Sequence, residues 1–364
     1  LKKRALILPQ VEPMPKMLAL KEALKATASF AREAPRLVAA VKDVILKKRI
    51  GARAKTVVVM ATNLGTLDLV ANFACSVRAL DEDKSSTLLQ SVLVFAADEY
   101  SATAVAELGV ASFYDKSLGE LPAAAAQTYG DFNFVRMMWL KVTSVYLVAT
   151  ARFNVLFQDA DVVWLRDPLP YFHSADPEVD AFFMDDGARS QRYTPFYANT
   201  GFYFLRTNDR VLYFVHRLLM GYDNILTVRS HQHALIMLLL EHVSKYGLTV
   251  NVLDKELFPQ GQIFHHKKHT MQRIVDRQIP ANVFHMCWTA GRTDKLAYMK
   301  NMGLWFLTPT CTLEAFQDNA DAFSRPPRGS RRPAHNVSSC CLRGLRAFDA
   351  PTPYTKAITI RSKK

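Results

Sequence analysis

The sequence of 364 residues lacks several patterns that would assign a class directly. No apolar run approaches the roughly 18–20 residues that span a bilayer, and no signal-peptide pattern follows Leu1. The absence of a G-x-G-x-x-G motif argues against a dinucleotide site of the Rossmann type. The five cysteines form no C-x-x-C pair and no zinc-type spacing, so neither a zinc site nor a disulfide can be deduced from them.

The chain has an excess of positive charge, and this excess is confined to its two ends. Of the formal net charge of +13, residues 1–55 carry +10 and residues 325–364 carry +9, so residues 56–324 carry −6. A nucleic-acid groove needs cations clustered on a folded face, so we expect no nucleic-acid partner. An acidic body instead suits a protein that binds an anionic ligand through a bridging metal cation.

Hydrophobic content of 49% and charged content of 22% match a soluble globular protein with a sizeable core. Short apolar runs alternate with helical periodicity after residue 55, and this β-α-β-α-β order predicts an α/β fold with a doubly wound sheet whose ligands lie at the carboxyl ends of the strands. We expect strands at 56–61, 88–97, 110–114, 153–157, 179–184, 201–205 and 248–252 and helices at 67–80, 99–108, 122–151, 208–221 and 231–246.

The same patterns divide the chain into three parts. Residues 1–54 are predicted to form a basic amphipathic helical stem, because apolar residues recur at helical spacing among many cations. Residues 55–324 form the α/β domain. Residues 325–364 are rich in Pro, Arg and Ser with little periodicity, so we expect a disordered tail.

The chemistry begins where the strand at 153–157 runs into Asp159 and Asp161. Side chains at positions i and i+2 of an extended chain point the same way. Two like charges side by side repel, and burying them unpaired is costly, whereas a divalent cation removes both problems. Carboxylate oxygens suit Mg²⁺ or Mn²⁺. A solvated pair of aspartates at a strand end is the structural alternative.

A second enzyme class shares this pattern. The opening motif of haloacid-dehalogenase-type phosphatases resembles residues 159–163, and Asp185 and Asp186 would then complete their Mg²⁺ site. Three predicted strands precede the motif here, whereas that family begins with it, and its Lys and Ser/Thr motifs have no match in order. This Mg²⁺-dependent phosphatase therefore stays the alternative function.

Six further segments follow in sequence order and favour one family. Together they resemble the nucleotide-diphospho-sugar transferases of glycosyltransferase family 77, which is related to family 8, over residues 55–308. The segments are Trp164–Phe172, Asn199–Arg206, His231–His233, Leu257–Gly261, His285–Lys295 and Gly303–Trp305.

The resemblance implies a GT-A fold, a Rossmann-like α/β domain with a mostly parallel central sheet flanked by helices. It also implies a metal-dependent retaining glycosyltransferase, with Mn²⁺ or Mg²⁺ as cofactor. The donor would be a UDP-sugar carrying a pentose or galactose, and the acceptor a glycan or glycoprotein, such as one of a cell wall. A catalytically inactive GT-A binding module is a further alternative.

Roles for individual residues come from the same resemblance. Asp159 and Asp161 match the metal-binding pair, and His285 matches a third ligand. Gly291 and Lys295 match the segment that holds the diphosphate. The cation would stabilise the charge developing on the leaving diphosphate, and Lys295 would add a point charge there.

The sugar pocket is the next expected region. Asn199 and Gly201 match an Asn-x-Gly strand that lines it. Gln232 matches the second residue of an Asp-Gln pair and is a catalytic candidate, although His231 replaces the Asp.

Two further pairs complete the expected site. Asp185 and Asp186 are catalytic candidates that would contact the sugar or acceptor, and Thr62 and Asn63 follow the first strand, where the nucleotide is expected. By family habit we expect a type II membrane protein of the Golgi lumen, with a membrane anchor that this sequence does not include.

Overall fold

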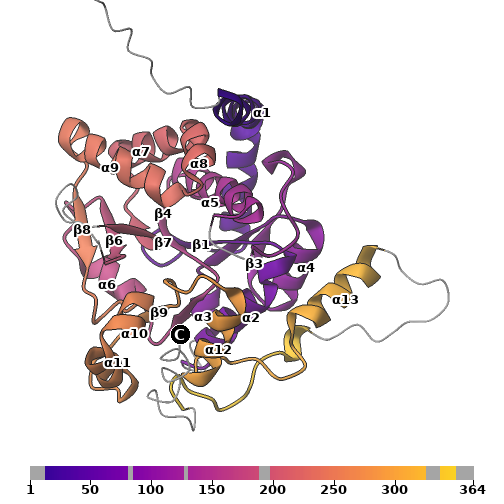
Figure 1. Cartoon of the computed structure of the whole chain (residues 1–364), viewed down its shortest axis with the longest axis vertical. Coiled ribbons are helices and arrows are strands. Elements are labelled where there is room, and N and C mark those ends of the chain that lie inside the picture. Colours follow the sequence, from indigo (N-terminus) through magenta and orange to yellow (C-terminus); the bar gives the residue numbers. More distant parts are fainter. Residues whose placement is uncertain (1–12, 81–84, 127–129, 188–196, 325–336, 350–364) are drawn as a thin grey trace, which may run out of the picture.

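The computed structural model describes residues 13–80, 85–126, 130–187, 197–324 and 337–349. At its centre lies a seven-stranded sheet of order β3-β2-β1-β4-β7-β6-β8 (Figure 1). Every neighbouring pair is parallel except the two that involve β7. Its strands are β1 (Thr56–Thr62), β2 (Val92–Ala96), β3 (Ala111–Phe113), β4 (Asn154–Gln158), β6 (Ala181–Asp185), β7 (Ala198–Leu205) and β8 (Val250–Leu253). The predicted α/β fold with a mostly parallel sheet is confirmed.

Helices cover both faces of this sheet (Figure 1). Side chains alternate along β1, so that Val58 and Met60 enter one core while Val57 and Val59 enter the other. One core is shared with α1 (Pro13–Lys47), α5 (Phe132–Thr150), α7 (Asp209–Met220), α8 (Tyr222–Val228) and α9 (His231–Tyr246). The opposite core is shared with α2 (Leu67–Arg78), α3 (Ser85–Leu89), α4 (Glu99–Glu107), α6 (Leu169–Ser174), α10 (Gly261–His266), α11 (Lys268–Val275), α12 (Arg292–Asn301) and α13 (Leu313–Ser324).

A separate two-stranded sheet, which sequence patterns did not predict, lies beside the main one. It pairs β5 (Val162–Trp164) with β9 (Val283–His285) in antiparallel register. Each strand has only three residues, too few for a periodicity of two to stand out. This small sheet joins the segment after Asp161 to a part of the chain more than a hundred residues later.

The helix α5 begins later than its hydrophobic pattern predicted. The expected helix at 122–151 starts only at Phe132, where the Asp131 carboxylate accepts a hydrogen bond from the backbone N–H of Phe134. Pro122 and Gly130 lie in the excluded stretch, and Gly130 adopts a positive φ of 80° that does not fit a helix. The apolar residues of 122–126 therefore belong to a loop.

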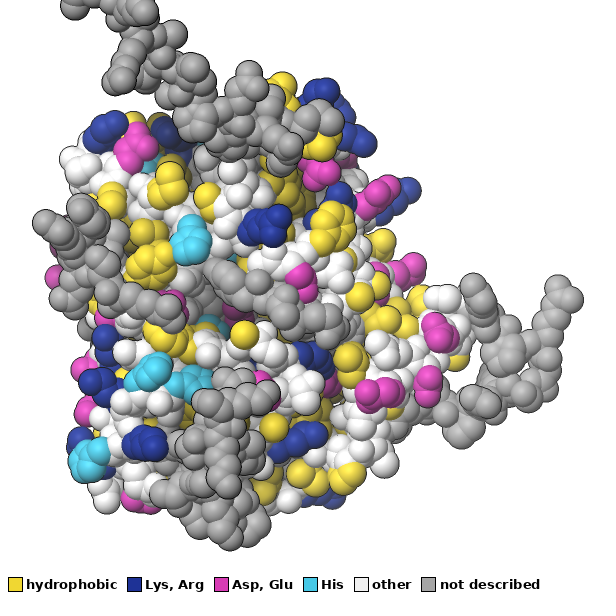
Figure 2. Space-filling model, viewed as in Figure 1, with side chains coloured by type: hydrophobic (Ala, Val, Ile, Leu, Met, Phe, Trp, Pro, Cys, Tyr) yellow, Lys and Arg dark blue, Asp and Glu magenta, His cyan; other side chains and the backbone are white. Residues whose placement is uncertain are grey.

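The basic N-terminal segment, predicted to be helical, forms one long helix, α1. One face of α1 is buried against the domain through Phe30, Leu37, Val41 and Ile45. Between Met17 and Lys47 its Lys and Arg side chains are exposed. On the face shown in Figure 2, cations and acids of the described residues are interspersed. The segment predicted as a stem is thus packed on the domain from Ala23 onward.

The C-terminal segment differs from the expected disordered tail over residues 337–349. Two disulfides, Cys75–Cys341 and Cys311–Cys340, attach this stretch to α2 and to the segment before α13. Adjacent cysteines that pair with partners far away in the sequence give no spacing signature, which is why the pairing could not be deduced. Residues 325–336 and 350–364 of the predicted tail lie outside the described residues. Within the described residues no helix has the length and apolar character needed to cross a bilayer.

The pairing predicts a simple chemical result. Cys287 is the one free cysteine of the five, so unfolding without reductant should expose one titratable thiol per chain, and five after reduction. Replacing Cys75 by Ser should lower the free energy of unfolding by about 2–4 kcal/mol, because the cross-link restricts the unfolded chain. Thiol titration and thermal unfolding measure both; five thiols before reduction would refute the pairing.

Candidate functional site

The direction of the strands brings the candidate residues to one edge of the sheet. The carboxyl ends of β4 and β6 lie there, and because β7 runs the opposite way, its first residues lie there too. Asp159 follows β4, Asp186 follows β6 and Asn199 is the second residue of β7. The backbone N–H of Asp159 donates to the carbonyl oxygen of Gly201 at 2.8 Å, which fixes the turn after β4 against β7.

The small β5–β9 sheet brings His285 to the two aspartates. Val162 pairs with His285, and the N–H of Met286 donates to the carbonyl oxygen of Asp161 at 3.2 Å. As a result, the Nε2 atom of His285 lies 3.3 Å from Oδ1 of Asp161. The predicted third ligand is therefore close to both aspartates although it follows Asp159 by 126 residues.

These three side chains fit a divalent cation. One ligand atom from each of Asp159, Asp161 and His285 lies within 4.8 Å of the others. Two carboxylates and an imidazole form a donor set suited to Mn²⁺ or Mg²⁺ with waters and phosphate oxygens completing the shell. Gly201 packs directly behind the group: a Cβ atom there would lie 2.2 Å from Cε1 of His285 and 2.9 Å from Oδ2 of Asp159.

Two lysines neutralise the aspartates. Nζ of Lys141 in α5 lies 2.5 Å from Oδ1 of Asp159, and Nζ of Lys295 in α12 lies 2.5 Å from Oδ2 of Asp161. Burial raises the pKa of Asp161, but the positive charges of Lys295 and His285 outweigh it and hold that pKa well below its ordinary value. Asp161 is thus a buried, ionised carboxylate, as a metal ligand must be, whereas the charged His285 would have to release its proton before its ring could bind a metal.

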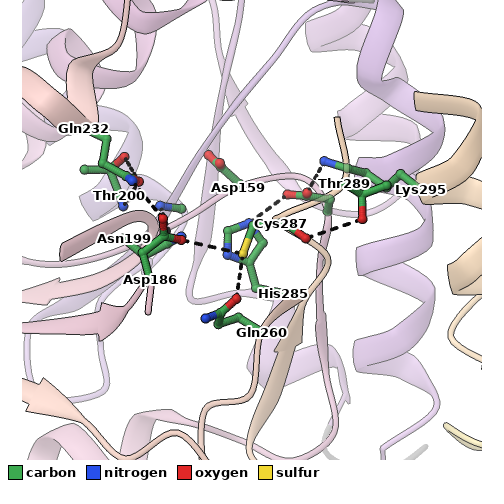
Figure 3. Close-up of polar contacts among 12 residues, drawn as sticks. Asp159, Asp186, Asn199, Thr200, Gln232, Gln260, His285, Cys287, Thr289 and Lys295 are labelled. Atoms are coloured by element: carbon green, nitrogen blue, oxygen red, sulfur yellow. Dashed lines mark hydrogen bonds and ion pairs between the residues drawn. The ribbon is translucent and has the colours of Figure 1, made fainter. Parts of the chain in front are cut away.

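A hydrogen-bonded network around Asp186 forms the neighbouring wall. Its Oδ1 accepts from Nδ2 of Asn199 at 2.6 Å, and its Oδ2 accepts from Nε2 of Gln232 at 3.2 Å. The indole N–H of Trp288 donates to the Asp186 carbonyl at 2.9 Å. Burial raises the pKa of Asp186, and these hydrogen bonds offset the rise only in part. Figure 3 shows this network on one side of His285 and Lys295 on the other.

A cavity of about 710 Å³ is lined both by the Asp159, Asp161 and His285 group and by the network around Asp186. Its size is typical of small-molecule sites. Most of the predicted residues line it, together with several that sequence reasoning missed. The predicted ones are Asp159, Asp161, Asp186, Asn199, Gly201, Gln232, His285 and Lys295, and the missed ones include Phe134, Lys141, Tyr197, Thr200, Cys287, Trp288 and Thr289.

Four predicted residues lie outside the cavity lining. Thr62 and Asn63 are buried and do not line the cavity. The Thr62 hydroxyl is hydrogen-bonded to that of Thr66 at 2.9 Å, whereas the Asn63 side chain donates to the carbonyls of Pro122 and Ala124 and so stabilises a loop. Asp185 points to Lys255, with Oδ2 and Nζ 2.9 Å apart. Gly291 precedes the first residue of α12 and supports Lys295 through the backbone.

The missed Lys141 had a recognisable signal. In α5 it and Arg136 are the only charged residues among otherwise apolar or neutral ones. A single lysine in an apolar helix suggests a charge that compensates a buried carboxylate. Which carboxylate it compensates is known only once the fold shows how the helix packs. Cys287 gave no signal, because its thiol interacts with Gln260 and Asp186 across distant segments.

Comparison with known proteins identifies the family. Residues 87–299 match the sequence model of the nucleotide-diphospho-sugar transferases. The chain belongs to this family. The resemblance inferred from the motifs is confirmed, and the family match leaves the phosphatase alternative without support.

Two named relatives show the range of the family. The chain is 25% identical over 274 residues to the beta-arabinofuranosyltransferase RAY1 of Arabidopsis thaliana, covering 69% of this chain and 48% of that protein. It is 27% identical over 205 residues to the UDP-galactose:fucoside alpha-3-galactosyltransferase of Dictyostelium discoideum, covering 50% of this chain and 30% of that protein. The chain thus spans less than half the length of either relative.

Solved structures show more distant similarity. The galactosyltransferase LgtC, in complex with donor and acceptor sugar analogs, aligns with a TM-score of 0.42 and 16% identity over 74% of this chain and 97% of that chain. Mouse xyloside xylosyltransferase 1 aligns with a TM-score of 0.38 and 12% identity over 64% of this chain and 98% of that chain.

The close contact behind the three ligands gives a direct test. Changing Gly201 to Ala should displace His285 and Asp159, abolish Mn²⁺ binding and lower the free energy of unfolding by about 1–3 kcal/mol, since the added methyl overlaps fixed atoms. Changing Gly291 to Ala is the matched control, because a Cβ atom there meets only Oδ2 of Asp294 at 3.7 Å. Calorimetric Mn²⁺ titration and thermal unfolding measure the outcome. Unchanged binding in the Gly201 variant would contradict the assigned ligand geometry.

Proposed function

We propose that this chain is the catalytic domain of a metal-dependent, retaining glycosyltransferase that uses a UDP-sugar donor. The observation that carries the proposal is the group of Asp159, Asp161 and His285, with ligand atoms within 4.8 Å of one another at the edge of a cavity of about 710 Å³. Family membership supplies the reaction class, and this group supplies the place where a nucleotide diphosphate would be held.

Different residues would bind the two parts of the donor, the leaving diphosphate and the sugar. Asp159, Asp161 and His285 would hold Mn²⁺ or Mg²⁺, which as a Lewis acid stabilises charge on the departing diphosphate. Lys295 lies at the same place and would bind the diphosphate as a point charge. Fixed charges of this kind accelerate a reaction because they need no reorganisation as the anomeric bond breaks.

The opposite wall is suited to hydroxyl groups. Asp186 is held by Asn199 and Gln232, while the Oε1 atom of Gln232 accepts from the N–H of Thr200 at 3.1 Å. Carboxylate and amide groups fixed in this way can exchange hydrogen bonds with sugar hydroxyls and orient the anomeric carbon. We therefore assign this wall to the donor sugar and the incoming acceptor.

The relatives narrow the substrates. One is named an arabinofuranosyltransferase and the other a galactosyltransferase that uses UDP-galactose, so a pentose or galactose is the proposed transferred sugar and a glycan or glycoprotein is the proposed acceptor. Retention of the anomeric configuration is proposed from the family 77 resemblance. None of the carboxylates of the site is assigned as a covalent nucleophile.

The cellular location is proposed from the cysteines. Disulfides persist in oxidising compartments such as those of the secretory pathway. Four of the five cysteines are paired, one pair linking residues 266 positions apart. This supports the Golgi lumen, where a type II membrane protein would place its catalytic domain.

Removing one metal ligand tests the function. Changing Asp159 to Asn should lower the rate of UDP release from UDP-arabinose, UDP-xylose or UDP-galactose at least about 100-fold, because the lost charge is worth several kcal/mol of barrier. Thermal unfolding should show that the fold persists. Asp209→Asn is the matched control, since that side chain is 93% exposed and lies away from the cavity.

The same assay separates the enzyme from an inactive module. The unaltered chain should release UDP from at least one of these donors with Mn²⁺ and lose that activity with a chelator. Full activity in the Asp159 variant, or none with any UDP-sugar in the unaltered chain, would refute the proposal.

A further inference from the structure

The two aspartates that would bind a cation are already paired with two other cations. Lys141 reaches Asp159 from α5, and Lys295 reaches Asp161 from α12, each with a nitrogen–oxygen distance of 2.5 Å. The lysines lie on different helices and are 154 positions apart in the sequence. Each carboxylate therefore has a compensating charge of its own before any metal is bound.

Both ion pairs are shielded from water. The side chains of Lys141 and Asp159 are 14% and 22% exposed, and those of Lys295 and Asp161 are 22% and 8% exposed. Charges in such surroundings interact strongly and are screened little by salt. Placing a divalent ion on the same carboxylates brings it next to two ammonium groups, which repel it.

The environment of Lys141 strengthens its attachment to Asp159. The resemblance expects an aspartate at position 231, but His231 stands there, buried in the cavity wall. Burial, together with the charge of Lys141, holds the pKa of His231 well below its ordinary value, so the ring is neutral. Position 231 thus offers no negative charge to Lys141. Among the described residues, the carboxylate that pairs with the Lys141 ammonium group is that of Asp159.

We propose that Lys141 is a positioning residue that occupies Asp159 in the free protein and gives it up when a nucleoside diphosphate enters. This inference rests on the proposed function. The diphosphate brings negative charge that attracts the ammonium groups, and their movement frees the carboxylates for the divalent ion. Cation and nucleotide then bind interdependently, and each raises the affinity for the other by the same factor.

Removal of Lys141 and removal of Lys295 should affect different ligands. The family resemblance already gives Lys295 a place on the diphosphate, so its removal weakens nucleotide binding directly. Lys141 pairs with the first aspartate, and the main effect of its removal should be on the affinity for the cation without nucleotide. If Lys141 only supported the structure, its removal would lower the affinity for the cation instead of raising it, because loss of a supporting contact weakens metal binding.

Mn²⁺ titration of the whole chain, followed by electron paramagnetic resonance with and without saturating UDP, tests the inference. In the unaltered chain UDP should raise the Mn²⁺ affinity about 5- to 150-fold, the usual range of such coupling, after correction for Mn²⁺ bound by free UDP. Lys141→Met should raise the nucleotide-free Mn²⁺ affinity at least tenfold, about 1.4 kcal/mol, and reduce the enhancement by UDP accordingly.

Three further variants serve as controls. Lys141→Arg keeps the charge and should behave as the unaltered chain. Lys255→Met removes a lysine paired with Asp185 outside the cavity lining and should leave the Mn²⁺ affinity unchanged. Lys141→Gln provides a second neutral variant in case Lys141→Met does not fold. Both neutral variants should be stabilised by Mn²⁺ more than the unaltered chain in thermal unfolding.

Two results would overturn the inference, and only one of them would also contradict the proposed function. If Mn²⁺ binds to the unaltered chain and to both neutral variants with the same nucleotide-free affinity, Lys141 does not hold Asp159 against the cation, and the proposed function stands. If folded protein binds no Mn²⁺ even with UDP, the metal dependence in the proposed function fails together with the inference.

Discussion

The structure depends on how two neighbouring carboxylates are compensated in a largely buried place. Asp159 and Asp161 follow a buried strand, and Asp161 is only 6% exposed. Unpaired charges there would destabilise the fold strongly. The protein meets this requirement with two lysines and a histidine, each brought in by a different element. We propose that this group of charges binds a divalent cation together with a diphosphate, whose negative charge attracts the two ammonium groups.

The sheet topology explains why this place is also a cavity. Reversal of β7 between β4 and β6 turns its first residues toward the carboxyl ends of its neighbours, so Asn199 and Gly201 lie beside Asp159 and Asp186. The β5–β9 pairing then adds His285 from the second half of the domain. The site is thus built where segments from most of the domain meet, a common place for ligands in α/β folds.

Residues that follow strongly apolar strands could be predicted from the sequence. The strand before Asp159 and the helix after Thr66 appear close to their expected bounds, because the local hydrophobic pattern determines them. The role of His285 came only from the family resemblance, since the three-residue strands that place it carry no pattern. Lys141 stands out as a charged residue in an otherwise apolar helix, but its pairing with Asp159 depends on how that helix packs on the next strand. The pairing of Cys340 and Cys341 depends on packing between distant segments, which one sequence does not reveal. For the same reason the side chain of Asn63, expected at the nucleotide, turns out to stabilise a loop.

The most direct measurement is anomalous diffraction at the manganese edge from crystals grown with Mn²⁺ and UDP. One strong peak bonded to Asp159, Asp161 and His285, with the UDP diphosphate on its open side, is the predicted result. A peak elsewhere, or ordered UDP in the cavity with no manganese beside those three residues, would contradict the account.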